Sequence, residues 1–224
     1  MGNSFTNKHG VSIIFKMIKD IQDNKQYLSD IDGLIGDGDH GINMNKGFTL
    51  CEEKLKESEV NLSNGLKILS DILMMKIGGS MGPLYGLFFK AMAKESEGKE
   101  EIDAVVFQAM LEAIPAELSK VTKATPGDKT LMDCLIPAVS TYKDSIATAE
   151  SFESALTKMK NAAVAGRDST KDMISKVGRS SRLGERSIGV IDAGAASCCI
   201  ILCSIADSIV ELLTEVTQTQ HICQ

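Results

Sequence analysis

The sequence has no long apolar run and no excess of positive charge. No stretch of about 18 apolar residues is present, so we expect no membrane-spanning helix. The chain carries 24 Lys and Arg against 30 Asp and Glu, a net charge of −6, which argues against nucleic acid as a general partner. An apolar stretch typical of a signal peptide is also missing near the N-terminus. These absences predict a protein that binds neither a membrane nor nucleic acid.

The cysteines are not spaced as a zinc site. Cys198, Cys199 and Cys203 lie in an apolar run, and no histidine or further cysteine nearby completes a ligand set. Buried free thiols are the simplest interpretation of these residues. The other three cysteines are Cys51, Cys134 and Cys223. This cysteine usage fits a reducing environment, and we expect a cytoplasmic protein.

Sustained period-two alternation is missing as well, and helical periodicity takes its place. Val11, Ile14, Phe15 and Ile18 recur at the spacing of one helix face. The same kind of pattern predicts eight helices, over residues 10–24, 44–56, 62–77, 83–93, 102–120, from about 130 onwards, 152–165 and 193–213. Residues 170–177 are expected to form a further short helix. We predict one all-α domain over residues 1–224, a bundle or barrel with its functional loops at one end.

The most unusual stretch runs from Asp32 to Asn43. Three carboxylates, Asp32, Asp37 and Asp39, are interleaved with glycines at positions 33, 36, 38 and 41. One helix face cannot gather these aspartates, whereas the glycines let a loop curl tightly and bring them together. Converging negative charges repel one another unless a cation lies between them, and an all-carboxylate set favours Mg²⁺, Ca²⁺ or Mn²⁺. We interpret the stretch as a metal-binding loop, with a solvated acidic turn as the alternative.

Three familiar motifs do not account for this stretch. Residues 36–41 satisfy the pattern G-x-G-x-x-G, but the strand and βαβ unit that a dinucleotide site requires are not visible. The stretch does not match an EF-hand calcium loop either. If Asp37 is loop position 1, Gly41 occupies position 5, where an EF-hand has a side-chain ligand such as Asp or Asn. A Walker A motif is absent from the whole chain.

Two further segments are suited to phosphate. The turn Gly78-Gly79-Ser80-Met81-Gly82-Pro83 is interpreted as a backbone cradle for phosphate oxygens, with a plain helix connection as the alternative. The helix that opens at Met44 directs its first N–H groups towards an anion held near His40 to Asn43. A basic segment follows later, with the cations Arg167, Lys171, Lys176, Arg179, Arg182 and Arg186. Its part from Gly178 to Gly194 is predicted as a long functional loop, because arginine is suited to bidentate recognition of phosphate.

The turn before the sixth helix needs no functional explanation. Asp128 stands in the run Thr125-Pro126-Gly127-Asp128-Lys129-Thr130. An aspartate just before a helix commonly accepts hydrogen bonds from its first N–H groups. We therefore predict that Asp128 caps the helix that begins near Thr130.

Four blocks of sequence together resemble the L (ADP-binding) subunit of the phosphotransferase-dependent dihydroxyacetone kinases, which is equivalent to the nucleotide domain of single-chain ATP-dependent forms. The blocks follow the family's order and spacing across nearly the whole chain. They are Gly36-Asp37-Gly38-Asp39-His40-Gly41-Ile42-Asn43-Met44, Gly78-Gly79-Ser80-Met81-Gly82-Pro83-Leu84, Pro126-Gly127-Asp128-Lys129-Thr130, and the segment from Gly178-Arg179-Ser180-Ser181 through Leu183-Gly184-Glu185-Arg186-Ser187-Ile188-Gly189 to Asp192-Ala193-Gly194-Ala195.

This resemblance implies an eight-helix antiparallel up-down barrel whose loops at one end hold ADP or ATP through two Mg²⁺ ions. Asp32, Asp37 and Asp39 would be the metal ligands. The residues implied as nucleotide contacts are His40, Gly41, Ile42, Asn43, Gly79, Ser80, Met81, Thr130, Leu131, Arg179, Asp192, Ala193 and Gly194. Three positions depart from the family pattern, because Met81 replaces a common serine, Ala193 a usual proline and Thr122 a frequent glycine.

The resemblance also implies partners. In the family a separate K subunit holds the ketose, and bound ADP is rephosphorylated in place by a phospho-histidine carrier, the M subunit. Phosphoryl transfer depends mainly on positioning and charge neutralisation, so no catalytic residue is expected from this chain. A homodimer is one option for the oligomeric state. Three alternative hypotheses for the function remain. The chain could be a nucleotide-dependent regulator of another protein, an ATP-dependent kinase subunit for another short ketose, or a two-metal phosphatase.

Overall fold

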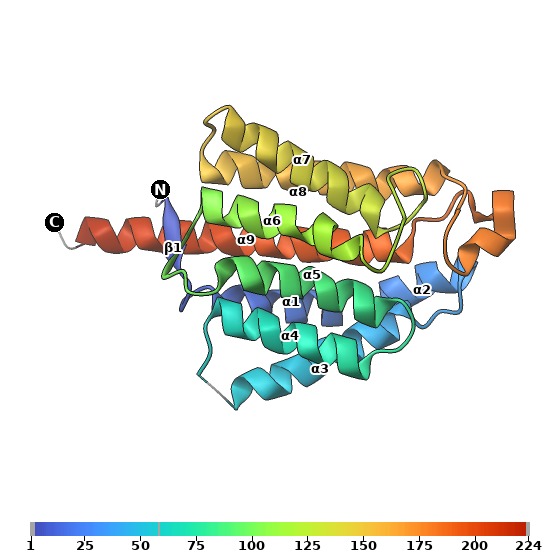
Figure 1. The fold of residues 1–224 in the computed structure, drawn as a ribbon, viewed down its shortest axis with the longest axis horizontal. Coiled ribbons are helices and arrows are strands. Elements are labelled where there is room, and N and C mark those ends of the chain that lie inside the picture. Colours follow the sequence, from blue (N-terminus) through green and yellow to red (C-terminus); the bar gives the residue numbers. More distant parts are fainter. Residues whose placement is uncertain (1–2, 58, 223–224) are drawn as a thin grey trace.

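The structure, a computed structural model, describes residues 3–57 and 59–222. Within these residues the chain forms nine α-helices and a two-stranded sheet (Figure 1). The helices are α1 (Val11–Asp23), α2 (Lys25–Ile35), α3 (His40–Lys56), α4 (Leu62–Lys76), α5 (Met81–Ser96), α6 (Ala104–Leu118), α7 (Leu131–Ala147), α8 (Phe152–Ser169) and α9 (Ala193–Ile222). Two 3₁₀ segments, η1 (Thr170–Asp172) and η2 (Ser180–Ser187), connect α8 to α9. The predicted all-α class is confirmed.

Helix α9 is the core helix of the bundle. It packs against α1, α7 and α8, and Ala196, Ile201 and Leu202 along it are buried. By length and composition alone its part Ala193–Val216 could cross a membrane, although acidic residues interrupt its apolar run. However, 72% of the apolar window is buried inside the protein. The apolar character of α9 is therefore explained by the helices that surround it.

The remaining helices each bury one face. On α1 the predicted face places Ile14 and Ile18 in the core together with Ile21, whereas Phe15 of that face is exposed. Consecutive helices such as α4 and α5, and α7 and α8, pack along each other after short connections. Short connections make such neighbours antiparallel, and Figure 1 shows the helices lying side by side in one bundle.

Helix α2 is the main difference from the predicted elements. The sequence predicts that the acidic loop follows the first helix, but residues 25–35 are helical and only Asn24 separates α2 from α1. Leu28 and Ile35 are buried seven positions apart, and Ile31 packs against the core between them. This spacing is a helical signal that the nearby glycines and aspartates obscure.

Other boundaries differ by smaller amounts. Helix α3 begins at His40 instead of Met44, so its first turn contains the residues expected in the loop. Residues 101–103 form strand β2 (Glu101–Asp103), not the start of a helix, and pair antiparallel with β1 (Ser4–Thr6), with Phe5 opposite Ile102. Three-residue strands are too short to show a period-two pattern. The predicted short helix over residues 170–177 is reduced to the single turn η1.

The cysteines of the described residues are free thiols. Cys51, Cys134, Cys198 and Cys199 are buried, and Cys203 is half-buried. Burial raises the pKa of the Cys51 thiol to about 12, so this side chain stays protonated. The interpretation as buried thiols is thus confirmed for Cys198 and Cys199, whereas Cys203 is only half-buried. Cys223 lies outside the described residues.

The loops that the sequence analysis selects gather at one end of the bundle. At the right of Figure 1 the end of α2, the start of α5 and the segment between α8 and α9 lie together, whereas β1 and the C-terminal end of α9 lie at the left. The sequence predicts that the functional loops collect at one end, and the candidate site therefore lies at this end of the bundle.

Candidate functional site

The three acidic residues converge, although they come from different elements. Asp32 lies in the last turn of α2, and Asp37 and Asp39 lie in the loop that leads to α3. One carboxylate oxygen from each residue takes part, and these three oxygens all lie within 4.8 Å of one another. Gly38, with a φ of 75°, turns the chain between the two loop aspartates. Among the described residues this is the only such group of potential metal ligands.

The chemistry of the cluster fits a hard cation. Three carboxylates at this separation repel one another, and a divalent ion with oxygen ligands removes the repulsion. Asp37 is exposed and the other two are half-buried, so the cluster is open to solvent. Mg²⁺ usually keeps several waters and binds through carboxylates together with phosphate oxygens, which an open cluster permits. The roles of the three aspartates as ligands stay predictions.

The basic segment reaches the acidic cluster. Arg179, at the start of η2, forms an ion pair with Asp37 although the two residues are far apart in sequence. The arginine side chain is 62% exposed, so it can change partner without leaving a buried position. Because arginine binds phosphate in a bidentate manner, this position suits an anion held beside a metal.

Four helices begin at the same cavity. The cavity measures about 820 Å³, within the range of roughly 300–1,000 Å³ that is typical of ligand sites. Its lining includes the first residue of four helices, His40 of α3, Met81 of α5, Leu131 of α7 and Ala193 of α9. The N-terminus of a helix carries a partial positive charge and N–H donors. The convergence therefore favours an anionic ligand such as phosphate.

The glycine-rich turn before α5 leaves space at the cavity. Gly79 has a φ of 68°, and a Cβ atom added at Gly78 or Gly79 would meet nothing within 4 Å. Ser80 follows as an exposed residue and makes no side-chain capping bond with α5. This geometry is compatible with the predicted cradle for phosphate oxygens.

The ring of His40 is buried and hydrogen-bonded inside the protein. Its Nε2 atom lies 2.8 Å from Ser197 Oγ, which lies 2.5 Å from the Tyr85 hydroxyl, and that hydroxyl donates to the carbonyl oxygen of Gly194 at 3.0 Å. Burial lowers the pKa of His40 to about 4, with Asp32 acting in the opposite direction. The ring is therefore neutral and links the starts of α3 and α9.

The start of α9 is fixed by Asp192. Its Oδ1 atom accepts a hydrogen bond from the Ala195 N–H at 2.7 Å, and its own N–H donates to Thr170 Oγ1 at 3.0 Å. The residue is half-buried as a whole, but its carboxyl group is enclosed, and this burial raises the pKa of Asp192 to about 7. Gly194 lies close to the start of α7, since an added Cβ would be 3.5 Å from Leu131 N.

The prediction that Asp128 caps α7 is wrong. Thr130 is the N-cap, and its side chain accepts from Met132 N, while Asp133 accepts from Thr130 N to complete a capping box. Asp128 instead accepts from Thr125 N at 2.8 Å and Thr125 Oγ1 at 3.1 Å, and pairs with Lys176. The capping position lies two residues later because the tight turn at 125–128 uses the aspartate to close itself.

Most of the predicted site residues line the cavity. Those that do are Asp32, Asp37, Asp39, His40, Asn43, Gly79, Ser80, Met81, Thr130, Leu131, Arg179, Asp192, Ala193 and Gly194. The structure does not bring Gly41 or Ile42 to the lining, because Gly41 is packed against α2 and the side chain of Ile42 is 53% exposed. Lining residues that the sequence analysis did not select include Val121, Ala124 and Lys129. Their positions depend on how distant loops meet, which no local pattern reports.

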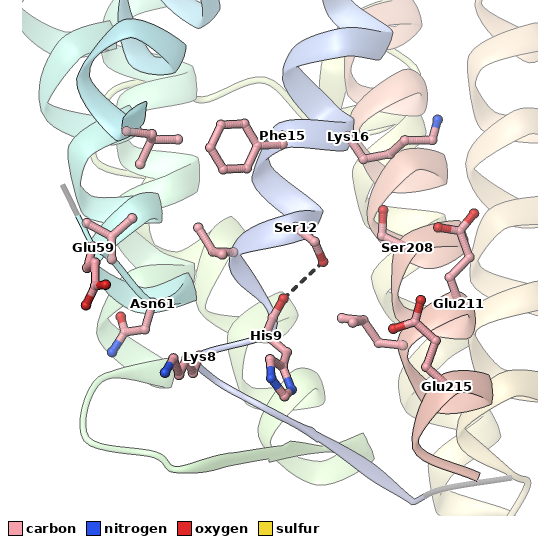
Figure 2. A pocket seen from close by; sticks show the side chains of 14 residues that line it. Lys8, His9, Ser12, Phe15, Lys16, Glu59, Asn61, Ser208, Glu211 and Glu215 are labelled. Atoms are coloured by element: carbon pink, nitrogen blue, oxygen red, sulfur yellow. Dashed lines mark hydrogen bonds between the residues drawn. The ribbon is translucent and has the colours of Figure 1, made fainter. Parts of the chain in front are cut away.

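A second hollow lies away from this end of the bundle. Figure 2 shows it around α1, lined by side chains of both charge signs, with Ser12 donating to the carbonyl oxygen of His9 at 3.0 Å. Its volume is about 910 Å³, but it contains no converging ligand set among the residues that the structure describes. The cavity at the acidic cluster is therefore the better candidate site.

The chain is similar to one known protein family and to several known proteins. A family model described as DAK2 domain matches residues 34–207. The chain is 38% identical over 182 residues to the PEP-dependent dihydroxyacetone kinase 1, ADP-binding subunit DhaL, of Listeria innocua, covering 81% of this chain and 86% of that protein. It is 40% identical over 183 residues to the PTS-dependent dihydroxyacetone kinase, ADP-binding subunit DhaL, of Lactococcus lactis, covering 81% and 87%.

A solved structure has the same fold. The dihydroxyacetone kinase of C. freundii, crystallised with AMP-PNP and Mg²⁺, matches with a TM-score of 0.66 at 21% identity, over 93% of this chain and 35% of that chain. The family model covers most of the chain, and the sequence identity to the two DhaL subunits is 38% and 40%, so the family of the chain is established. The chain belongs to the DAK2 domain family, together with the ADP-binding subunits of dihydroxyacetone kinases.

Proposed function

We propose that this chain is the nucleotide-binding subunit of a ketose kinase, which transfers a phosphoryl group from bound nucleotide to dihydroxyacetone or a similar small ketose. The observation that carries the proposal is the contact between the acidic cluster and Arg179 inside a cavity where four helices begin. An acidic cluster alone would repel a nucleotide, but with bridging cations and an arginine it becomes a diphosphate site. Its similarity to subunits named for ADP binding supports the same ligand.

The residues present fit a magnesium nucleotide. Asp32, Asp37 and Asp39 would hold two Mg²⁺ ions, which when bound supply charge neutralisation to the phosphate oxygens. Arg179 and the N–H groups at the helix starts bind and orient the same oxygens. Met81 and Leu131 offer apolar contact, which suits a base or ribose better than a phosphate.

Among the described residues of the lining, three titratable side chains outside the acidic cluster are already engaged within the protein. His40 is hydrogen-bonded to Ser197, Lys129 is bound to backbone carbonyls, and the Asp192 carboxyl accepts from the N–H of Ala195. A general base must stand within hydrogen-bond reach of the proton that it takes. We therefore assign the ketose and its base to a separate K subunit, with rephosphorylation of ADP by a phospho-histidine carrier.

The surface around the cavity suits a partner protein. Several large apolar side chains are exposed at this end, on the end of α2, the start of α3, the end of α4 and the loops beside them: Leu34, Ile42, Met75, Val121, Val177 and Ile188. Exposed apolar groups that collect at one site indicate protein contact. A K subunit docked on this apolar rim would bring the ketose to the bound nucleotide.

Reconstitution tests the proposal. The purified chain is mixed with a K subunit, dihydroxyacetone and either the phosphorylated carrier with its donor system or ATP, and ketose phosphate is measured. We expect product only when chain, K subunit and one phosphate donor are all present, and the productive donor identifies the carrier-dependent or ATP-dependent form. If the chain binds ADP but yields no product with either donor, it is a nucleotide-dependent regulator and the kinase proposal is wrong.

A further inference from the structure

Lys129 is a buried charge that the proposed nucleotide contacts do not use. It stands just before the N-cap of α7, lines the cavity and is 1% exposed. Its φ of 60° is a left-handed conformation that lysine seldom adopts. Both burial of the charge and this backbone conformation cost free energy, so the surrounding structure must offset them.

The ammonium group is fully engaged with backbone. Its Nζ atom donates to the carbonyl oxygens of Met173 at 3.2 Å, Ser187 at 2.6 Å and Val190 at 2.6 Å. Because an ammonium has three N–H donors, none remains for a phosphate oxygen. Burial lowers the pKa of Lys129, while Asp192 and Asp172 favour its charged form. Lys129 is therefore a backbone ligand, although it lines a cavity suited to phosphate.

The three acceptors enclose the segment that carries Arg179. Met173 precedes this segment, and Ser187 and Val190 follow it. Between them the chain has one 3₁₀ segment, interrupted at Gly184, and many exposed residues. Regular secondary structure fixes little of this segment, so its position depends on contacts with other parts of the chain. The ammonium of Lys129 provides such contacts at both ends of the segment.

Neighbouring contacts join the same two parts of the chain. The carbonyl oxygen of Asp128 accepts from Lys176 N at 3.2 Å, and the Asp128 carboxylate pairs with Lys176 Nζ at 3.2 Å. Ser187 Oγ accepts from Ser175 N at 2.9 Å, and so closes the segment on itself. The turn at 125–130 and the segment at 173–190 thus form one hydrogen-bonded unit.

We propose that Lys129 is a positioning residue whose ammonium holds both ends of the Arg179 segment at the start of α7, and so sets where the guanidinium stands above the acidic cluster. The contacts of Lys129 with Met173, Ser187 and Val190 fix the position of the segment. Its consequence for ligand binding rests on the proposed function, because there Arg179 meets the phosphates.

Limited digestion with trypsin tests the structural part without any nucleotide. The segment contains four cleavage sites, after Lys176, Arg179, Arg182 and Arg186. In Lys129→Met we expect cleavage in this segment to become several-fold faster than in the unmutated protein, with no such increase in the helices, and Lys129→Arg to restore part of the protection. Lys160→Met is the matched control, since it removes a lysine that pairs with Asp207 on α9 away from the cavity. Unchanged cleavage in Lys129→Met would overturn the inference.

A double-mutant cycle tests the link to Arg179. We expect Lys129→Met to weaken binding of ADP with Mg²⁺ by about tenfold, and to cause no further loss in a chain that already carries Arg179→Gln. Independent, additive losses would show that Lys129 does not act through Arg179. If the unmutated chain binds no ADP, the proposed function fails while the digestion result still decides the role of Lys129.

Hydrogen exchange provides a test that needs no variant. If Lys129→Met does not fold, the amides of Lys176 and Gly189 are followed in the unmutated protein, since they donate to the carbonyls of Asp128 and Lys171. Exchange as slow as in the helices supports a fixed unit. Exchange as fast as in an open loop overturns it.

Discussion

The acidic residues meet because a helix ends and a glycine turns the chain between them. Asp32 is held by α2, while Asp37 and Asp39 lie on either side of Gly38, which adopts a positive φ. The His40 N–H donates to Asp32 Oδ2 at 3.3 Å, so the start of α3 also contributes to the position of the first carboxylate. The three carboxylates repel one another, so a positive charge has to lie beside them, and in this structure Arg179 supplies it.

His40 gives a pH-dependent prediction. Burial lowers its pKa from about 6.5 to about 4, so between these values the unfolded chain binds more protons than the folded protein. The contribution of the neutral ring is therefore fully present above about pH 6.5 and is lost as the pH falls towards about 4, an effect of order 3 kcal/mol. We expect the metal-free protein to have a higher free energy of unfolding than its His40→Gln variant above about pH 6.5. Denaturant titrations should show this difference becoming smaller as the pH is lowered towards about 4. A difference that does not change with pH would contradict the assignment of a buried neutral ring.

At the scale of elements, the contact between α2 and α3 depends on Gly41. A Cβ atom at this position would overlap the carbonyl oxygen of Lys25 and lie 2.6 Å from Ser29 Oγ. Gly41→Ala is expected to lower the free energy of unfolding by about 3 kcal/mol, because overpacking forces the two helices apart. Chemical denaturation measures the loss. Gly78→Ala is the control, since a Cβ there meets nothing within 4 Å, and an equal effect of both changes would refute the packing argument.

The elements also show what the sequence can predict. Long helices such as α1, α4 and α8 follow from their apolar periodicity, and the loops rich in Gly, Asp and Arg follow from residue chemistry. Helix α2 was missed because two aspartates and a glycine interrupt the pattern of Leu28, Ile31 and Ile35. The role of Lys129 was also missed, because its partners lie about 44 to 61 positions away and only the tertiary fold brings such carbonyls together.

At the scale of the whole molecule, the bundle presents its cavity and its apolar rim at the same end. Leu34 and Met75 on this rim are 67% and 71% exposed, and both lie at helix ends beside the cavity. Replacing both by glutamate is expected to weaken association with a K subunit strongly while leaving ADP affinity within about twofold, because a buried charge opposes docking but lies outside the nucleotide contacts.

The control for this experiment is Val105→Glu. Val105 is 65% exposed at the start of α6, next to β2 and away from the cavity. Co-sedimentation of the two subunits and a separate ADP titration measure the two effects. Equal loss of association in the rim variant and the control would show that this end of the bundle is not the docking surface.

The central claim is that divalent ions make the acidic cluster a site for a nucleotide. Calorimetric titration of ADP into the chain tests it directly, with Mg²⁺, with a chelator, and in Asp37→Ala, with Asp207→Ala as the control because Asp207 pairs with Lys160 away from the cavity. We predict binding to the unmutated chain and the control in Mg²⁺, no measurable binding in chelator or in Asp37→Ala, and unchanged helical circular dichroism in every variant. Binding of ADP that persists without a divalent ion, or in Asp37→Ala, would contradict the account.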